Sequence, residues 1–171
     1  MIRYDEIESP IGRILAAVSE HGLRVMHFPH RGSAPAYLAT LIEGERFERS
    51  AESLAGVRGQ LDEYFAGRRT SFDLPLDLRG TDFQRRVWKA LSTIPYGATA
   101  SYGDIARQVG RPGGARAVGQ ANNRNPVGLV VPCHRVVASN GIGGYGSGLA
   151  IKEKLLALES RASLKASAVS R

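Results

Sequence analysis

The stretch Pro132-Cys133-His134-Arg135-Val136 contains the only cysteine in a chain of 171 residues. An apolar run from Val127 to Val131 precedes it and predicts a short buried strand. A segment rich in glycine follows, over residues 141–148. A thiol at the end of a strand, beside an imidazole and under a glycine-rich loop, is typical of a nucleophile. Because only the thiolate attacks, such a site needs a neighbouring base or cation that favours loss of the thiol proton.

The same residues also allow a structural interpretation. A lone cysteine is often a small buried hydrophobic residue, and a histidine beside it is often a hydrogen-bonded core residue. Adjacent side chains on a regular strand point to opposite faces, so Cys133 and His134 cooperate only if Pro132 ends the strand or a water molecule bridges them. The residues of this stretch leave both interpretations open.

The charge of the chain favours a polyanionic partner. There are 23 Lys and Arg residues against 16 Asp and Glu residues, which gives a formal net charge of +7. A basic balance of this size suits nucleic acid, although many basic proteins are simply solvated cations.

The cysteine count and the apolar runs indicate a soluble protein in a reducing compartment. One cysteine excludes an internal disulfide and a cysteine-rich zinc site. His27 and His30 have no neighbouring cysteine or clustered carboxylates, so we expect no metal. The N-terminus lacks a signal-peptide core, and no apolar run approaches the roughly 20 residues that span a membrane. We therefore expect a cytoplasmic protein.

Residues 1–78 predict a small structural domain. Three short apolar runs between residues 2 and 28, separated by turn residues, indicate an antiparallel meander. Residues 50–66 have the apolar face of a helix, and residues 72–78 form an extended connection. We place a domain boundary after this connection.

Residues 79–160 predict a second, mostly helical domain. Thr81 begins a capping-box pattern ahead of a helix that extends to about residue 93. A final helix is expected over residues 150–160. The remaining residues, 161–171, are basic and rich in serine and alanine, and we expect a flexible tail there.

Between these two helices lies the pattern of a helix-turn-helix. Ser101 can cap a helix that ends near Val109, and a glycine-containing turn at residues 110–113 leads to a second helix at residues 114–123. An ordinary amphipathic helix pair with a solvated polar face is the alternative. Polar side chains suited to phosphates and base edges lie on or just after the second helix, namely Arg116, Gln120, Asn122, Asn123 and Arg124.

The cysteine stretch resembles the active-site signature of the O6-alkylguanine-DNA alkyltransferases. Other segments resemble this family in the same order and at its spacing: residues 115–119, Ala121-Asn122, Asn125-Pro126, residues 144–148, Lys152, Leu155-Leu156 and Glu159. The resemblance covers about residues 80–159, with weaker similarity back to residue 1. It implies an α/β (α+β) fold: an N-terminal small antiparallel sheet with a helix, RNase H-like, and a C-terminal winged helix-turn-helix-like domain that carries the active site.

The resemblance implies DNA repair by direct reversal. The family moves an alkyl group from O6 of guanine in duplex DNA to its own cysteine, and the thioether product lets each molecule act only once, without a cofactor. Cys133 matches the acceptor, and His134 matches the residue that takes the thiol proton through a water molecule. Glu159 matches the carboxylate that orients this histidine, and Asn125 matches the residue that braces the recognition helix against the active-site strand.

The resemblance also implies that a monomer binds duplex DNA through the minor groove and flips the alkylated nucleotide out of the helix. Arg116 matches the residue inserted into the gap, and Tyr102 matches the residue that displaces the flanking phosphate. The positions that match the wall of the base pocket are Val136, Tyr145, Gly146 and Ser147.

Two positions in this pocket depart from the family pattern. Family members often carry a polar residue at the position of Gly146 and glycine at that of Ser147. The loop after Cys133 is also one residue shorter than in some relatives. These departures bear on which alkyl groups are accepted and leave the reaction unchanged.

Three other functions compete with alkyl transfer. A lesion-binding protein of the alkyltransferase-like class would lack the acceptor, whereas this chain has Cys133. A transcription regulator of this family would carry a cysteine-rich domain, for which the chain has no cysteines. A thiol hydrolase built on Cys133 and His134 would need an oxyanion hole and repeated turnover.

Overall fold

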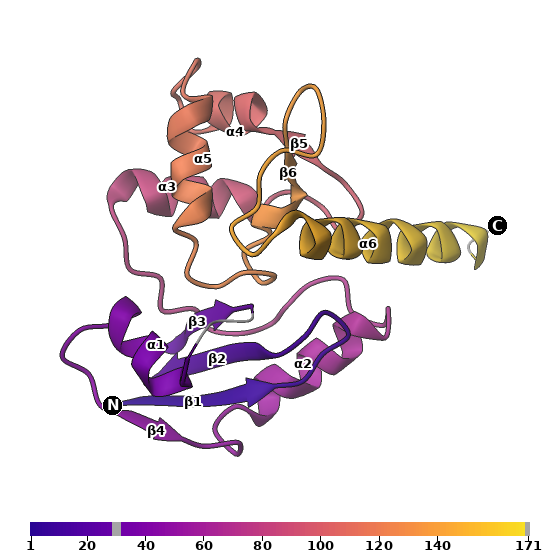
Figure 1. The fold of residues 1–171 in the computed structure, drawn as a ribbon. Helices are drawn as coiled ribbons and strands as arrows, with labels where there is room; N and C mark the ends of the chain where they lie inside the picture. Colours follow the sequence, from indigo (N-terminus) through magenta and orange to yellow (C-terminus); the bar gives the residue numbers. More distant parts are fainter. Residues whose placement is uncertain (29–31, 170–171) are drawn as a thin grey trace. The chain divides into compact units, whose positions relative to one another are not determined.

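The chain divides into two units, Met1–Leu78 and Arg79–Arg171, and each is described separately. The structure is a computed structural model that describes residues 1–28 and 32–169 (Figure 1). Within that part of the chain, no helix combines the length and the apolar character needed to cross a bilayer.

A four-stranded sheet forms the centre of the first unit, in the order β3-β2-β1-β4 (Figure 1). Strands β1 (Ile2–Ile7), β2 (Ile14–Ser19) and β3 (Gly22–His27) make the expected antiparallel meander. The short strand β4 (Phe47–Arg49) adds a parallel neighbour to β1, so the sheet is mixed rather than wholly antiparallel.

Two helices accompany this sheet. Helix α1 (Ala34–Leu41) begins after Ser33, whose side chain accepts a hydrogen bond from the backbone, and it was not expected from the sequence. Helix α2 (Ala55–Phe65) lies within the predicted residues 50–66 but begins five residues later. One cluster of buried apolar side chains joins β1, β2, β3 and α1: Ile2, Tyr4, Leu15, Ala17, Val25, Ala34, Leu38 and Ile42.

The histidines of the first unit do not form a metal site among the described residues. No group of three His, Cys, Asp or Glu side chains that could hold an ion occurs in residues 1–28 and 32–169. His27 Nδ1 lies 2.8 Å from the hydroxyl of Tyr37. His30 lies outside the described residues.

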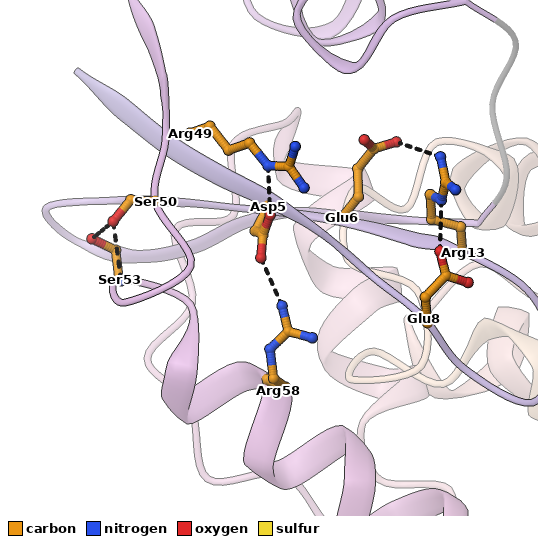
Figure 2. A network of polar contacts seen from close by, with 8 residues as sticks. All are labelled: Asp5, Glu6, Glu8, Arg13, Arg49, Ser50, Ser53 and Arg58. Carbon is orange, nitrogen blue, oxygen red and sulfur yellow. Dashed lines mark hydrogen bonds and ion pairs between the residues drawn. The ribbon is translucent and has the colours of Figure 1, made fainter.

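A buried carboxylate ties β1 to β4 and α2 (Figure 2). Asp5 is 3% exposed, and its two oxygens accept hydrogen bonds from Arg49 Nε at 2.9 Å and from Arg58 Nη2 at 2.6 Å. Burial raises the pKa of Asp5, but the hydrogen bond from Arg49 and the two guanidinium charges outweigh it and lower the pKa. A buried charge with two such partners fixes the geometry of the three elements.

The end of the first unit runs alongside β3. Leu23 donates its backbone N–H to Pro75 O at 2.8 Å, and Asp77 N–H donates to Leu23 O at 2.9 Å. Gly22 makes this approach possible, because its φ is +135° and a Cβ at this position would lie 2.3 Å from Pro75 O.

The second unit is mostly helical, as expected, and a pair of short parallel strands lies beside its helices. Capping boxes begin two of the helices, with Thr81 and Gln84 at α3 and with Ser101 and Asp104 at α4. Trp88 Nε1 donates to Ala121 O at 2.9 Å and joins α3 to α5. The elements are α3 (Asp82–Leu91), β5 (Ala100–Ser101), α4 (Tyr102–Gln108), α5 (Ala115–Asn123), a 3₁₀ turn (Cys133–Arg135), β6 (Val136–Val137) and α6 (Leu149–Val169).

The predicted strand at Val127–Val131 is wrong. The segment is buried but folds into turns, with Val131 N–H donating to Val127 O at 3.0 Å and Leu129 at a φ of 70°. The physical cause is Asn125, whose side chain accepts from Val127 N–H at 3.1 Å and donates to Val131 O at 2.8 Å. These local bonds satisfy backbone groups that a strand would have paired with a neighbouring strand.

The last helix is longer than predicted. We expected it to end at residue 160 and a flexible tail to follow, but α6 continues as far as Val169. Residues 161–169 contain neither glycine nor proline, so nothing in this segment interrupts the helix.

We predict that Gly22→Ala destabilises the protein by about 2–4 kcal/mol, because the new Cβ meets a backbone oxygen at a strained φ. The matched control is Gly56→Ala in α2, where nothing lies within 4 Å of an added Cβ. That change is expected to stabilise by up to about 1 kcal/mol. Urea unfolding followed by far-UV circular dichroism measures both, and equal effects would contradict this account of the connection.

Candidate active site

Cys133 is the first residue of the 3₁₀ turn, directly after Pro132. Successive side chains in such a turn are about 120° apart rather than on opposite faces as in a strand. Cys133 is 7% exposed and His134 is fully buried, so both side chains lie inside the second unit. The turn therefore removes the geometric objection that a regular strand would raise to their cooperation.

Asn125 holds the thiol as well as the turn before it. Its Nδ2 lies 3.2 Å from Cys133 Sγ and 2.8 Å from Val131 O. Because this amide group also fixes the Val127–Val131 turns, the position of the sulfur depends on Asn125, two residues after the end of α5.

His134 and Glu159 form a buried pair, with 2.8 Å between Nε2 and Oε1. Burial raises the pKa of Glu159, but the hydrogen bonds from His134 and Arg135 outweigh it and bring the pKa to about 2. Burial lowers the pKa of His134, so the imidazole is neutral and the carboxylate is ionised. An ionised carboxylate only accepts, so Nε2 must carry the hydrogen and Nδ1 keeps a lone pair. Nδ1 is buried and has no hydrogen-bond partner among the described residues.

Arg135 also binds the carboxylate of Glu159, a role that the sequence did not reveal. Its Nε donates to Glu159 Oε2 at 2.9 Å and its Nη2 donates to Oε1 at 3.0 Å, which makes a two-pronged ion pair. Its Nη1 donates to Ile94 O at 2.8 Å, and its guanidinium lies 5.7 Å from the centre of the Tyr96 ring. One feature of the sequence could have indicated this role: Arg135 directly follows His134, and the carboxylate matched to that histidine, Glu159, needs a positive partner if it is buried.

Lys152 is a second buried cation that the sequence did not reveal as a site residue. It is 0% exposed, and its Nζ donates to Val136 O at 2.6 Å and to Gly144 O at 2.9 Å. It thereby ties α6 to β6 and to the glycine-rich segment. The signal was its spacing of seven residues from Glu159, which places both on one face of a helix.

The surroundings of the thiol act on its pKa in opposite directions. Burial raises the pKa of Cys133. Hydrogen bonds from Asn125 and Tyr145 and the charge of Lys152 oppose this change without cancelling it. The pKa of Tyr145 is raised well above its usual value by burial first and then by the neighbouring thiol.

Tyr102 lies between α5 and the glycine-rich segment. Its hydroxyl donates to Gly144 O at 3.3 Å. Its ring lies close to two glycines. A Cβ added to Gly119 would be 3.8 Å from the Tyr102 ring, and a Cβ added to Gly143 would be 3.1 Å from it. The ring of Tyr102 thus lies between α5 and the glycine-rich segment. Of the other residues that match the base pocket, Val136 is buried and Gly146 and Ser147 are exposed.

Four of the five polar residues assigned to DNA contact lie on the surface of the second unit: Arg116, Gln120, Asn123 and Arg124. Arg116 and Gln120 line a hollow of about 360 Å³ beside the turn that leads into α5. Asn122 is different, because its side chain is buried and its Nδ2 lies 3.5 Å from Cys133 O.

We predict that Glu159→Gln removes part of the acid sensitivity of folding. The folded-state pKa is about 2 against an ordinary 4.5, so the ionised carboxylate stabilises fully above about 4.5, and this contribution of about 3 kcal/mol is lost as the pH falls toward about 2. The variant is also expected to be less stable at pH 7, because Arg135 loses its counter-charge. Urea unfolding at a series of pH values measures both effects.

The control for this experiment is Glu153→Gln, an exposed carboxylate on the same helix. It should leave the acid dependence unchanged. If Glu159→Gln lost stability with falling pH as steeply as the unchanged protein, the buried ion pair would not have the role described.

Comparison with known proteins covers both units. Residues 2–78 match the ribonuclease-like domain, and residues 82–161 match the DNA-binding domain, of the 6-O-methylguanine DNA methyltransferase family. The chain is 48% identical over 162 residues to a methylated-DNA–protein-cysteine methyltransferase of Mycolicibacterium paratuberculosis, and the match covers 94% of each chain. It is 51% identical over 157 residues to one of Methanosarcina barkeri, covering 91% of this chain and 96% of the relative.

Solved structures agree with these matches. The O6-methylguanine methyltransferase of Mycobacterium tuberculosis aligns with a TM-score of 0.84 at 46% identity, over 95% of this chain and 94% of that one. A structure of the Mycobacterium tuberculosis OGT in complex with DNA aligns with a TM-score of 0.83 at 46% identity, over 94% of each chain. With both units matched over nearly their whole length, the chain belongs to the O6-methylguanine-DNA methyltransferase family.

Proposed function

We propose that this protein repairs alkylated DNA by moving the alkyl group from O6 of guanine to the sulfur of Cys133, once per molecule. The observation that carries the proposal is the buried series Cys133, His134 and Glu159, next to a helix-turn-helix. It supplies a nucleophile, a base with an available lone pair and a carboxylate that orients the base.

The reaction proceeds as a displacement at the alkyl carbon. A bond forms between this carbon and Cys133 Sγ, while the bond from the carbon to O6 breaks and its electron pair stays with the guanine. Because the raised pKa of Cys133 keeps the thiol protonated, a base must take its proton. His134 Nδ1 receives this proton through a water molecule. The guanine anion takes up one proton at N1 from water and leaves as a neutral base, so that overall the proton lost by the thiol is balanced by the proton gained by guanine. The thioether has no simple way back to a thiol, so the protein does not turn over.

DNA reaches this site through the surface of α5. Arg116 is long, cationic and exposed, so it can fill the gap that a flipped nucleotide leaves in the minor groove. Tyr102 then lies between the flanking phosphate and the base, since its ring separates α5 from the glycine-rich segment. Gln120, Asn123 and Arg124 contact phosphates and groove edges, and the net charge of +7 strengthens binding to any duplex. The protein acts as a monomer in the cytoplasm.

Lesion binding without transfer is not favoured, because the acceptor sulfur is present at the centre of the site. A thiol hydrolase would form the same first bond but would release its product and act again. The number of events per molecule therefore separates these functions.

We predict that the protein, mixed with excess duplex DNA containing O6-methylguanine, gains one methyl group on Cys133 and then stops. Intact-mass measurement followed by peptide mapping locates the group. The control variant Cys133→Ser keeps the shape of the side chain, and it should bind the duplex and gain nothing. Lesion binding by the unchanged protein with no change in mass would indicate a recognition module, and repeated release of product would indicate a hydrolase.

A further inference from the structure

One face of α5 lies beside Tyr102, the glycine-rich segment and Cys133. An added Cβ at Gly119 would lie 3.8 Å from the ring of Tyr102, and one at Gly146 would lie 4.0 Å from Asn123 Oδ1. On the same helix, Asn122 Nδ2 lies 3.5 Å from Cys133 O. Positions 119, 122 and 123 are three and four residues apart, so they share one face of the helix.

The glycine-rich segment lies against the other edge of the Tyr102 ring. Tyr102 lies against this segment, at Gly143 and at Gly144 O. Tyr145, from the same segment, interacts with the Cys133 sulfur. The glycine-rich segment and the α5 face that includes Asn122 therefore both lie beside Cys133, so a base at the thiol lies close to both.

Asn122 has one polar atom that the described residues leave without a partner. The side chain is 9% exposed, and its Oδ1 is buried with no hydrogen bond within residues 1–28 and 32–169. The amide orientation follows from its neighbour, because exchanging the two ends would place Oδ1 against the carbonyl oxygen of Cys133. A buried acceptor without a donor is costly, and one beside a nucleophile indicates a donor on the ligand.

The enclosure of this atom does not keep a base away from it. The Cys133 thiol is equally enclosed, at 7% exposed, and must be reached in any alkyl transfer. A base that reaches the sulfur also comes within reach of Asn122, whose Nδ2 lies 3.5 Å from Cys133 O.

We infer that Asn122 Oδ1 accepts a hydrogen bond from the 2-amino group of the flipped guanine and thereby selects the base. The inference rests on the proposed function. Alkylation at O6 removes the hydrogen from N1, and N9 is bonded to the sugar, so the 2-amino group is the only N–H donor left on the base. O4-alkylthymine has lost its N3 hydrogen and has no amino group, so it offers this oxygen no donor. Asn122 therefore favours alkylated guanine over alkylated thymine.

This assignment separates Asn122 from the other polar residues of α5. The sequence placed it with the DNA-contacting residues Arg116, Gln120, Asn123 and Arg124, all of which are exposed. Its burial and its contact with Cys133 O place it with the base pocket instead.

The test uses two duplexes that differ in one group. O6-methylhypoxanthine has the same methyl group as O6-methylguanine and lacks only the 2-amino group. Single-turnover rate constants for methylation of Cys133 are measured on both duplexes, with the unchanged protein and with Asn122→Leu. The unchanged protein should prefer O6-methylguanine, and the variant should lose about tenfold of that preference. For each protein, the rate constant on O6-methylguanine is divided by that on O6-methylhypoxanthine. Comparing the two ratios cancels the different reactivities of the two bases and any general effect of the substitution.

Asn122→Ala gives the same comparison if Asn122→Leu does not fold, as judged by circular dichroism. A preference that is the same in the unchanged protein and in a folded variant would overturn the inference. Absence of methyl transfer to Cys133 from either duplex in the unchanged protein would instead overturn the proposed function, and this inference with it.

Discussion

The carboxylate of Glu159 is the group on which the rest of the site depends. It is buried, and a buried charge is stable only with close partners. Arg135 supplies a two-pronged ion pair, which leaves the carboxylate ionised and able only to accept from His134. This fixes the hydrogen of His134 on Nε2 and its lone pair on Nδ1. Arg135 therefore acts on His134 indirectly: it keeps Glu159 ionised, and Glu159 sets the tautomer of His134.

Two further polar side chains hold the backbone around this group. Asn125 lies two residues after the end of α5 and contacts both the turns before Cys133 and the sulfur, so its side chain joins the end of α5 to the thiol. Lys152 joins α6 to β6 and to the glycine-rich segment. The end of α5, the turn that contains Cys133, β6, α6 and the glycine-rich segment thus form one connected framework.

The sequence predicted the elements whose signals are local. Thr81 and Ser101 begin their helices as their capping patterns indicated. The strand at Val127–Val131 failed because apolar character reports burial but does not show that Asn125 satisfies the backbone in place of a neighbouring strand. The resemblance supplied Glu159, but it did not reveal Arg135 and Lys152 as site residues. A sequence shows that these residues are charged, whereas their burial and partners arise only when distant segments pack together.

The protonation state of His134 tests the central claim most directly. Nitrogen-15 NMR of the imidazole rings at neutral pH reports the charge and the tautomer, and a His134→Gln variant identifies its signals among the four histidines. The account predicts a neutral ring with hydrogen on Nε2 and none on Nδ1, because burial lowers the pKa of His134 and Glu159 stays ionised. An imidazolium at pH 7, or a neutral ring with its hydrogen on Nδ1, would contradict the assignment of His134 as the base.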